Sequence, residues 1–206
     1  MAVKIGVIGL GNMGSAHCRL INEINSLELT CITDVVADRV KDISDAYQCQ
    51  GFASADDLLK AKQCDAVLIA TPHYDHTPLG ISALDAGYHV LMEKPISVHK
   101  ADCEKLLAAH TRRRQVFAAM FNQRTNRFYQ TIRQMLTSGE LGQVRRINWT
   151  ITDWFRAQSY FDSGGWRATW SGEGGGVLLN QCPHQLDLLQ WRQVRCIDNP
   201  FKSECL

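Results

Sequence analysis

The sequence predicts an α/β protein in which a doubly wound parallel sheet, residues 1–124, is followed by an incomplete α+β second domain, residues 125–206. Two observations support this prediction. Through the first 124 residues, short runs rich in β-branched side chains alternate with helical patterns, and the runs are apolar almost without interruption. Strands buried on both faces of a parallel sheet have this composition. From Thr125 the pattern changes, which indicates a second architecture.

The first region is expected to contain five strands with helices between them. The strands are expected at VKIGVIG, LELTCITD, CDAVLIAT, YHVLMEKP and VFAAMFNQ. The helices are expected from about Met13, through Val40 and Ile43, from Leu79 to Ala86, and from about Lys100 to His110. In such a sheet the carboxyl ends of the strands share one edge, where ligands bind.

The second region begins with a helix expected from Thr125 to about Leu136. The alternation in RRINWTITDWF then predicts a strand with one face in water. A final helix is expected from Pro183, because proline is compatible with a first helical turn. Only 82 residues follow position 124, whereas a domain typically has on the order of 100 to 150. We therefore expect a C-terminally truncated second domain, whether as a fragment, a frameshifted product or a misassembled gene model.

The composition is that of a globular protein and excludes disordered and fibrous classes: 45% of residues are hydrophobic and the net charge is +1. The basic run 112–114 falls where a helix is expected to end, so a solvated helix terminus is favoured over a nucleic-acid site. No apolar run is long enough to span a membrane, and a cytoplasmic location is expected. The eight cysteines never form CxxC, so no metal site is expected.

A glycine motif follows the first expected strand. Gly9, Gly11 and Gly14 form G-x-G-x-x-G at the start of a helix, and Asp34 ends the second strand twenty residues later. The glycines permit a tight turn that brings backbone N–H groups close to a pyrophosphate, and the aspartate accepts hydrogen bonds from a ribose. This pattern predicts a Rossmann-type dinucleotide site. The alternative is a structural turn with an unrelated aspartate.

The bound dinucleotide is expected to be NAD. Asp34 repels the extra phosphate of NADP, and neither Val35 nor Val36 offers a cation that binds it. NADP is therefore the less favoured cofactor.

Two further stretches carry groups suited to nicotinamide chemistry. MEKP places Glu93 and Lys94 at the carboxyl edge of the sheet, where a partly buried lysine has a lowered pKa near a substrate oxygen. In GGGVLLNQCPHQLDLLQW, Asn180, His184 and Asp187 follow one another at spacings of four and three, and a helix from Pro183 places the last two on one face. Taken singly, the lysine is consistent with a surface turn and the histidine with a structural role.

Taken together and in order, these pieces resemble the glucose–fructose oxidoreductase and inositol dehydrogenase (Gfo/Idh/MocA) superfamily. The resemblance runs from about residue 3 to residue 191. Its motifs are GLGNMG, Asp34, ATPHYDH, MEKP, GGWRATW and GGGVLLNQCPHQLDLLQW.

The resemblance implies an NAD-dependent oxidoreductase that moves a hydride between nicotinamide and a secondary hydroxyl or carbonyl of a sugar, sugar derivative or cyclitol. By the same resemblance, Lys94 lies near both nicotinamide and substrate, His184 is the general base, and Pro95 follows a cis peptide bond. The implied cofactor-binding residues are Gly9, Gly11, Asn12, Met13, Gly14, Asp34, Thr71, Pro72, His76, Glu93 and Lys94.

The implied substrate-binding residues are Arg124, Trp166, Arg167, Asn180 and Asp187. Two roles stay open for Asp187, which either orients His184 or binds a substrate hydroxyl. Many members of the superfamily carry aspartate where this chain has Asn180. An amide orients a hydroxyl but takes no proton, so proton handling is expected to fall to His184 and Lys94.

A second class of function is a non-catalytic NAD(H)-binding redox sensor or partner subunit, or an inactive truncated fragment. The expected partner is a small sugar or polyol, with no nucleic acid and no membrane. The resemblance also implies a homo-oligomer for a full-length form.

Overall fold

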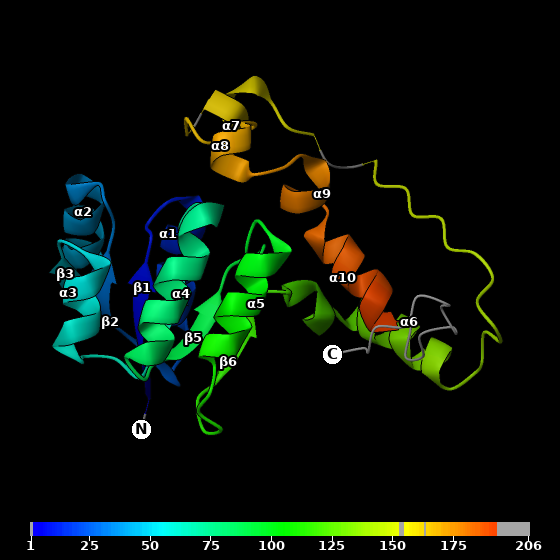
Figure 1. Cartoon of the computed structure of the whole chain (residues 1–206), viewed down its shortest axis with the longest axis horizontal. Helices are drawn as coiled ribbons and strands as arrows, with labels where there is room; N and C mark the ends of the chain where they lie inside the picture. Colours follow the sequence, from blue (N-terminus) through cyan, green and yellow to red (C-terminus); the bar gives the residue numbers. More distant parts are fainter. Residues whose placement is uncertain (1, 153–154, 163, 193–206) are drawn as a thin grey trace.

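The computed structural model describes residues 2–152, 155–162 and 164–192. A parallel sheet flanked by helices forms the first part, and a smaller, mainly helical part follows it (Figure 1). The strands are β1 (Val3–Ile8), β2 (Leu27–Thr33), β3 (Gln50–Phe52), β4 (Ala66–Ile69), β5 (His89–Met92) and β6 (Phe117–Ala119). The five predicted strands are confirmed, whereas the short edge strand β3 was not predicted.

The sheet has the order β3-β2-β1-β4-β5-β6, and every neighbouring pair is parallel. The chain reverses its direction of winding between β1 and β4, which lie side by side at the centre. In a doubly wound sheet this switch point opens a crevice at the carboxyl ends of the strands. The segments that follow β1, β4 and β5 therefore meet at one edge.

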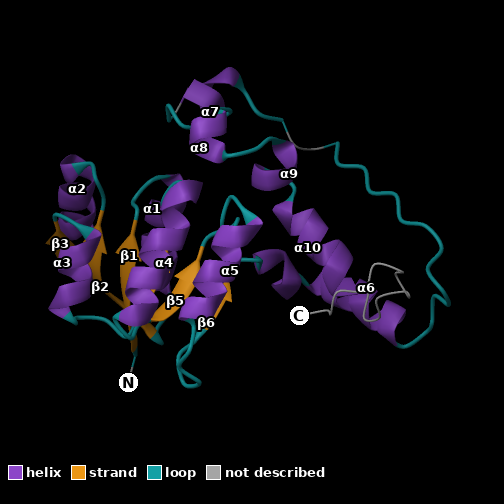
Figure 2. Ribbon diagram, viewed as in Figure 1, coloured by secondary structure: helices purple, strands orange, loops and turns teal. Residues whose placement is uncertain are grey.

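Helices cover both faces of the sheet, as the uninterrupted apolar strands predict (Figure 2). Successive strand residues point to opposite faces, so Val7 packs in one apolar cluster and Ile8 in the other. The first face is covered by α1 (Asn12–Glu23) and α2 (Ala37–Tyr47). The second is covered by α3 (Ala55–Ala61), α4 (His76–Asp85) and α5 (Lys100–Ala109).

The second part begins after the 3₁₀ turn η2 (Asn122–Thr125). Its helices are α6 (Arg127–Thr137), α7 (Gln158–Asp162), α8 (Trp170–Glu173), α9 (Val177–Asn180) and α10 (Pro183–Arg192). Helix α10 packs against α6 and η2, so the last described helix returns to the start of this region (Figure 1). The predicted helices near residues 125–136 and from Pro183 are confirmed.

The strand predicted at RRINWTITDWF is wrong for the described residues of that stretch. Residues 145–152 and 155 form no strand, and the segment runs out from α6 as an extended loop (Figure 1). A strand needs a neighbour to satisfy its backbone hydrogen bonds. The described part of residues 125–192 contains no strand, so this stretch has no neighbouring strand with which to form a sheet.

The helices give no indication of a membrane span. Within residues 2–152, 155–162 and 164–192, none combines the length and the apolar character that crossing a bilayer requires.

Candidate active site

The glycine turn after β1 has the geometry that its sequence predicts. Gly9 has φ +92°, a region that side chains disfavour, and a Cβ on Gly14 would lie 1.8 Å from the Gly9 carbonyl oxygen. A Cβ added to Gly11 would meet no atom within 4 Å, so the space beside this residue is open. Asn12 and Met13 form the first turn of α1 and are exposed beside this space. The turn thus offers free backbone at a helix N-terminus, a place that suits a pyrophosphate.

Asp34 follows β2, and its carboxylate is held by backbone. Oδ2 accepts a hydrogen bond from the Leu10 N–H at 2.6 Å, and Oδ1 accepts one from the Val36 N–H at 2.8 Å. The side chain is 6% exposed, and Arg39 lies 3.5 Å from it. The prediction that no cation lies near Asp34 rested on Val35 and Val36 alone. Arg39 was missed, although it follows in the first turns of α2.

The segment after β4 packs against the segment after β5. His76 is fully buried, with Nδ1 2.7 Å from the Pro95 carbonyl oxygen and Nε2 2.9 Å from the Thr71 carbonyl oxygen. The Thr71 hydroxyl is buried and has no hydrogen-bond partner in the described part of the chain. Pro72, which follows Thr71, is exposed. The Lys94–Pro95 peptide bond is cis, as the resemblance implies.

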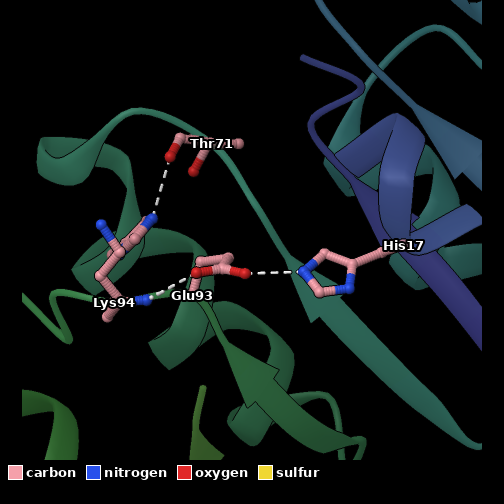
Figure 3. Close-up of polar contacts among 5 residues, drawn as sticks. His17, Thr71, Glu93 and Lys94 are labelled. Atoms are coloured by element: carbon pink, nitrogen blue, oxygen red, sulfur yellow. Dashed lines mark hydrogen bonds and ion pairs between the residues drawn. The ribbon is translucent and has the colours of Figure 1, made fainter. Parts of the chain in front are cut away.

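Glu93 and Lys94 follow β5, and their side chains contact different parts of the chain. Glu93 Oε1 lies 2.6 Å from His17 Nε2, and Glu93 Oε2 accepts the Lys94 N–H at 3.1 Å (Figure 3). His17 belongs to α1, which begins at the glycine turn. Burial alone raises the pKa of Glu93, but the hydrogen bond and charge of His17, together with the N–H and charge of Lys94, lower that pKa overall.

The Lys94 ammonium turns toward the second region. Nζ donates to the Asn180 carbonyl oxygen at 2.7 Å and lies 3.5 Å from Asn180 Oδ1. The Asn180 amide in turn donates to the Glu173 carboxylate, and both residues are buried. Burial lowers the pKa of Lys94, and the neighbouring charge of Glu93 opposes that shift. The structure thus joins two stretches that lie 86 residues apart in the sequence.

His184 lies in the first turn of α10. Its ring stands perpendicular to the ring of Phe121 with centroids 6.1 Å apart, and its buried Nδ1 has no hydrogen-bond partner among the described residues. Burial, reinforced by the charge of Lys94, lowers the pKa of His184. A neutral imidazole with one free nitrogen is the form that accepts a proton.

Asp187 does not hydrogen-bond to His184 in the structure. Instead its carboxylate receives two hydrogen bonds from the Arg124 guanidinium, one of them Nε to Oδ2 at 2.8 Å. This pairing raises the pKa of Arg124. Two predicted substrate-binding residues therefore engage each other at the junction of η2 and α10.

Trp166 and Arg167 sit over the segment that follows β4. The Trp166 ring meets the His73 ring edge-on with centroids 5.1 Å apart. Arg167 donates to the Tyr160 hydroxyl at 2.7 Å and lies over the rings of Tyr160 and Trp166. His73 Nδ1 lies 2.9 Å from the Glu173 carbonyl oxygen. Trp166 and Glu173 of the second region thus both contact His73 in the segment that follows β4.

A cavity of about 510 Å³ opens beside Asp34 between α2 and β3. A larger one, about 700 Å³, lies in the second region and is lined by Arg156, Phe161, Trp170, Glu173 and Gln181 among others. Glu173 connects this larger cavity to Lys94 through Asn180. In the described ranges of the chain, no three His, Cys, Asp or Glu side chains are placed to hold a metal ion.

Two family models match the chain. Residues 3–121 match the model described as an oxidoreductase family with an NAD-binding Rossmann fold, and residues 129–193 match the GFO/IDH/MocA C-terminal domain. The chain belongs to the GFO/IDH/MocA oxidoreductase family.

Two curated relatives are inositol dehydrogenases. The chain is 30% identical over 152 residues to inositol 2-dehydrogenase of Salmonella paratyphi B, covering 72% of this chain and 45% of that protein. It is 25% identical over 200 residues to myo-inositol 2-dehydrogenase of Thermotoga maritima, and the match covers 97% of this chain and 57% of that protein. The chain therefore spans about half the length of the curated relatives it matches.

Solved structures of the family share the fold. The WlbA dehydrogenase from Bordetella pertussis, crystallised with NADH and UDP-GlcNAcA, superposes with a TM-score of 0.82 at 27% identity, covering 93% of this chain and 58% of that one. GenD2 from gentamicin A biosynthesis, solved with NAD, has a TM-score of 0.79 at 22% identity, and the match covers 94% of this chain and 54% of that one.

The residues of this GFO/IDH/MocA chain fit NAD. The space beside Gly11 is open to a pyrophosphate, and the close packing of Gly14 on the Gly9 carbonyl oxygen brings the N-terminus of α1 to this turn. Asp34 follows β2 with a carboxylate that accepts hydrogen bonds from ribose hydroxyls. NAD is therefore the cofactor of this domain.

Proposed function

We propose that this chain is the dehydrogenase core of an NAD-dependent oxidoreductase acting on a CH–OH group of a sugar, sugar derivative or cyclitol. One observation supports the proposal most directly: Lys94 leaves the carboxyl edge of the sheet and donates to Asn180, four residues before His184. We therefore propose that the dinucleotide turn, Lys94 and His184 face one crevice.

NAD, when bound, supplies the hydride acceptor or donor at nicotinamide C4. His184 is proposed to take the hydroxyl proton during oxidation and return it during reduction, since its lowered pKa keeps the ring neutral near pH 7. Lys94 is proposed to hold the substrate oxygen with its ammonium. Asn180 orients the lysine and, being an amide, takes no proton.

The substrate is proposed to extend from Lys94 and His184 toward the cavity of about 700 Å³, whose lining includes Glu173, the hydrogen-bond partner of Asn180. Its wall combines aromatic surface from Phe161 and Trp170 with polar groups from Glu173 and Gln181, a lining suited to a ring that carries hydroxyls. The relatives named as inositol dehydrogenases support a cyclitol or sugar, and WlbA supports a sugar derivative. Trp166, Arg167 and the pair Arg124 and Asp187 are proposed to border this site. The homo-oligomer and the cytoplasmic location stay predictions.

The proposal is tested by comparing cofactor binding with hydride transfer. NADH and NADPH are titrated by fluorescence, and oxidation is measured over a panel of cyclitols, hexoses and sugar acids. We expect NADH to bind more tightly than NADPH, with Asp34→Ala narrowing the difference. We expect Lys94→Ala and His184→Ala each to lower turnover by about 100-fold or more while NADH affinity is retained. His99→Ala, at an exposed position on α5's N-terminal side, is the matched control.

Normal turnover in both active-site variants would contradict the assignment of these residues. Tight NADH binding without stereospecific hydride exchange against any substrate of the panel would instead favour the non-catalytic sensor. If a folded chain did not bind NADH, both the dehydrogenase and the non-catalytic sensor would be contradicted.

A further inference from the structure

His17 and Glu93 form a buried contact that the proposed chemistry does not use. The two residues are 8% and 7% exposed, and their side chains meet at 2.6 Å although they lie 76 residues apart. His17 stands three residues after Gly14, on the helix whose N-terminus faces the dinucleotide. Glu93 stands directly before Lys94. The contact therefore links the cofactor helix to the lysine segment (Figure 3).

Both oxygens of Glu93 are fixed by this arrangement. Oε1 faces His17, and Oε2 accepts the backbone N–H of Lys94. Because a carboxylate only accepts hydrogen bonds, His17 Nε2 carries the donated proton. The carboxylate is held beside the segment that carries Lys94, whose ammonium reaches the other way to Asn180.

We propose that His17 is a positioning residue that acts through Glu93 to keep a fixed negative charge beside Lys94. This inference rests on the proposed function only in giving Lys94 a role in the reaction. A buried carboxylate without a partner is costly, so it takes up a proton or turns toward water. Either change removes a negative neighbour that favours the protonated form of Lys94.

The effect on Lys94 has a definite sign. Burial favours its neutral form, and the charge of Glu93 is the largest opposing influence. Loss of that charge therefore makes Lys94 release its proton at lower pH. The other charged or titratable groups that act on Lys94, Glu93 or their neighbours are Glu173, Arg156, Arg167, His73, His76 and His184. None of them hydrogen-bonds to the Glu93 carboxylate among the described contacts, in contrast to His17.

The test reads Lys94 directly and needs no substrate. The folded chain is labelled with a trace of acetic anhydride across a pH series, and acetylation of Lys94, which requires the neutral amine, is followed by peptide mass spectrometry. The variants are His17→Leu, which keeps bulk without a donor, His17→Gln, whose amide donates from a similar position, and Glu93→Gln. His110→Leu is the control, since this partly buried histidine contacts a backbone carbonyl oxygen, that of Gln115, in the same domain.

We expect His17→Leu and Glu93→Gln each to move the labelling midpoint of Lys94 about one pH unit lower, which is about tenfold more labelling at a fixed pH below the midpoint. His17→Gln should stay near the unmodified chain, His110→Leu should not shift, and the double variant His17→Leu with Glu93→Gln should shift no further than Glu93→Gln alone.

An unchanged midpoint in a folded His17→Leu chain would overturn the proposal, as would an equal shift in His110→Leu. If His17→Leu fails to fold, Glu93→Gln decides: an unchanged midpoint there overturns the proposal, because the carboxylate is the group through which His17 acts. Since the labelling involves neither NAD nor sugar, its result is separate from that of the turnover panel. A chain that shows the shift but no dehydrogenase activity would retain this inference and lose the proposed function.

Discussion

The first region, residues 2–121, and the described part of residues 122–192 differ in how they bury apolar side chains. All but one of the fully buried hydrophobic residues lie in the first region, the exception being Leu188. The second region exposes large side chains such as Phe128, Phe155 and Leu178. The sheet thus has a packed core on each face, whereas the helices after it have little core of their own.

A few polar contacts join the two regions. Lys94 donates to Asn180, His73 contacts Glu173, and the Tyr74 hydroxyl donates to the Trp170 carbonyl oxygen at 3.2 Å. The comparison teaches that cofactor binding and overall stability depend on the first region, while the geometry of the reaction site depends on how the second region docks.

The largest effect is expected from a core truncation in the first region. Leu106 is fully buried between α5 and the sheet, so Leu106→Ala should lower the free energy of unfolding by about 2 to 5 kcal/mol. Leu178 is 66% exposed, so Leu178→Ala should change the free energy of unfolding by less than about 0.5 kcal/mol. Chemical denaturation followed by circular dichroism measures both. Equal losses would mean that the regions share one core.

A smaller effect on stability, with a large one on binding, is expected at Gly14. A Cβ there meets the Gly9 carbonyl oxygen at 1.8 Å, so Gly14→Ala should cost about 1 to 3 kcal/mol and abolish NADH binding. In the second region, a Cβ on Gly174 meets Val98 at 2.2 Å. Gly174→Ala should disturb docking yet retain NADH affinity. Fluorescence titration of both variants checks this, and loss of NADH binding in Gly174→Ala would contradict the separation.

At neutral pH the smallest effect is expected from replacing His73, because its contribution to stability changes only as the pH falls. Burial lowers the pKa of His73 to about 4, from 6.5. Between these values the unfolded chain binds more protons than the folded chain, so the stability contributed by neutral His73 is complete above about pH 6.5 and is lost as pH falls toward 4.

His73→Gln removes this titration and keeps a polar group that reaches the Glu173 carbonyl oxygen. Denaturation midpoints measured from pH 4 to 7 should therefore fall less steeply with decreasing pH in the variant. If the denaturation midpoint fell equally steeply with pH in both chains, the titration of His73 would not contribute to the stability of the folded chain.

Local patterns were enough to predict most of the first region. The glycine turn, the aspartate after β2 and the five apolar strands each follow from neighbours in the sequence, because strand burial and tight turns impose residue types over a few positions. The short elements β3 and α3 were missed. A three-residue strand gives almost no periodicity, although Ser54 caps α3 by accepting the Asp57 N–H, a signal that a search for helix caps detects.

The sequence alone determined the family, the dinucleotide turn and the residue types available for chemistry, since these depend on local conformation and motif spacing. Only the tertiary structure decided which side chains meet. His17 with Glu93, Lys94 with Asn180, and Arg124 with Asp187 lie 76, 86 and 63 residues apart. Partners at such separations leave no periodic signal in one sequence. The strand prediction that is wrong at residues 145–152 and 155 has the same physical cause: an alternating pattern specifies a face, whereas a strand also requires a neighbouring strand for its hydrogen bonds.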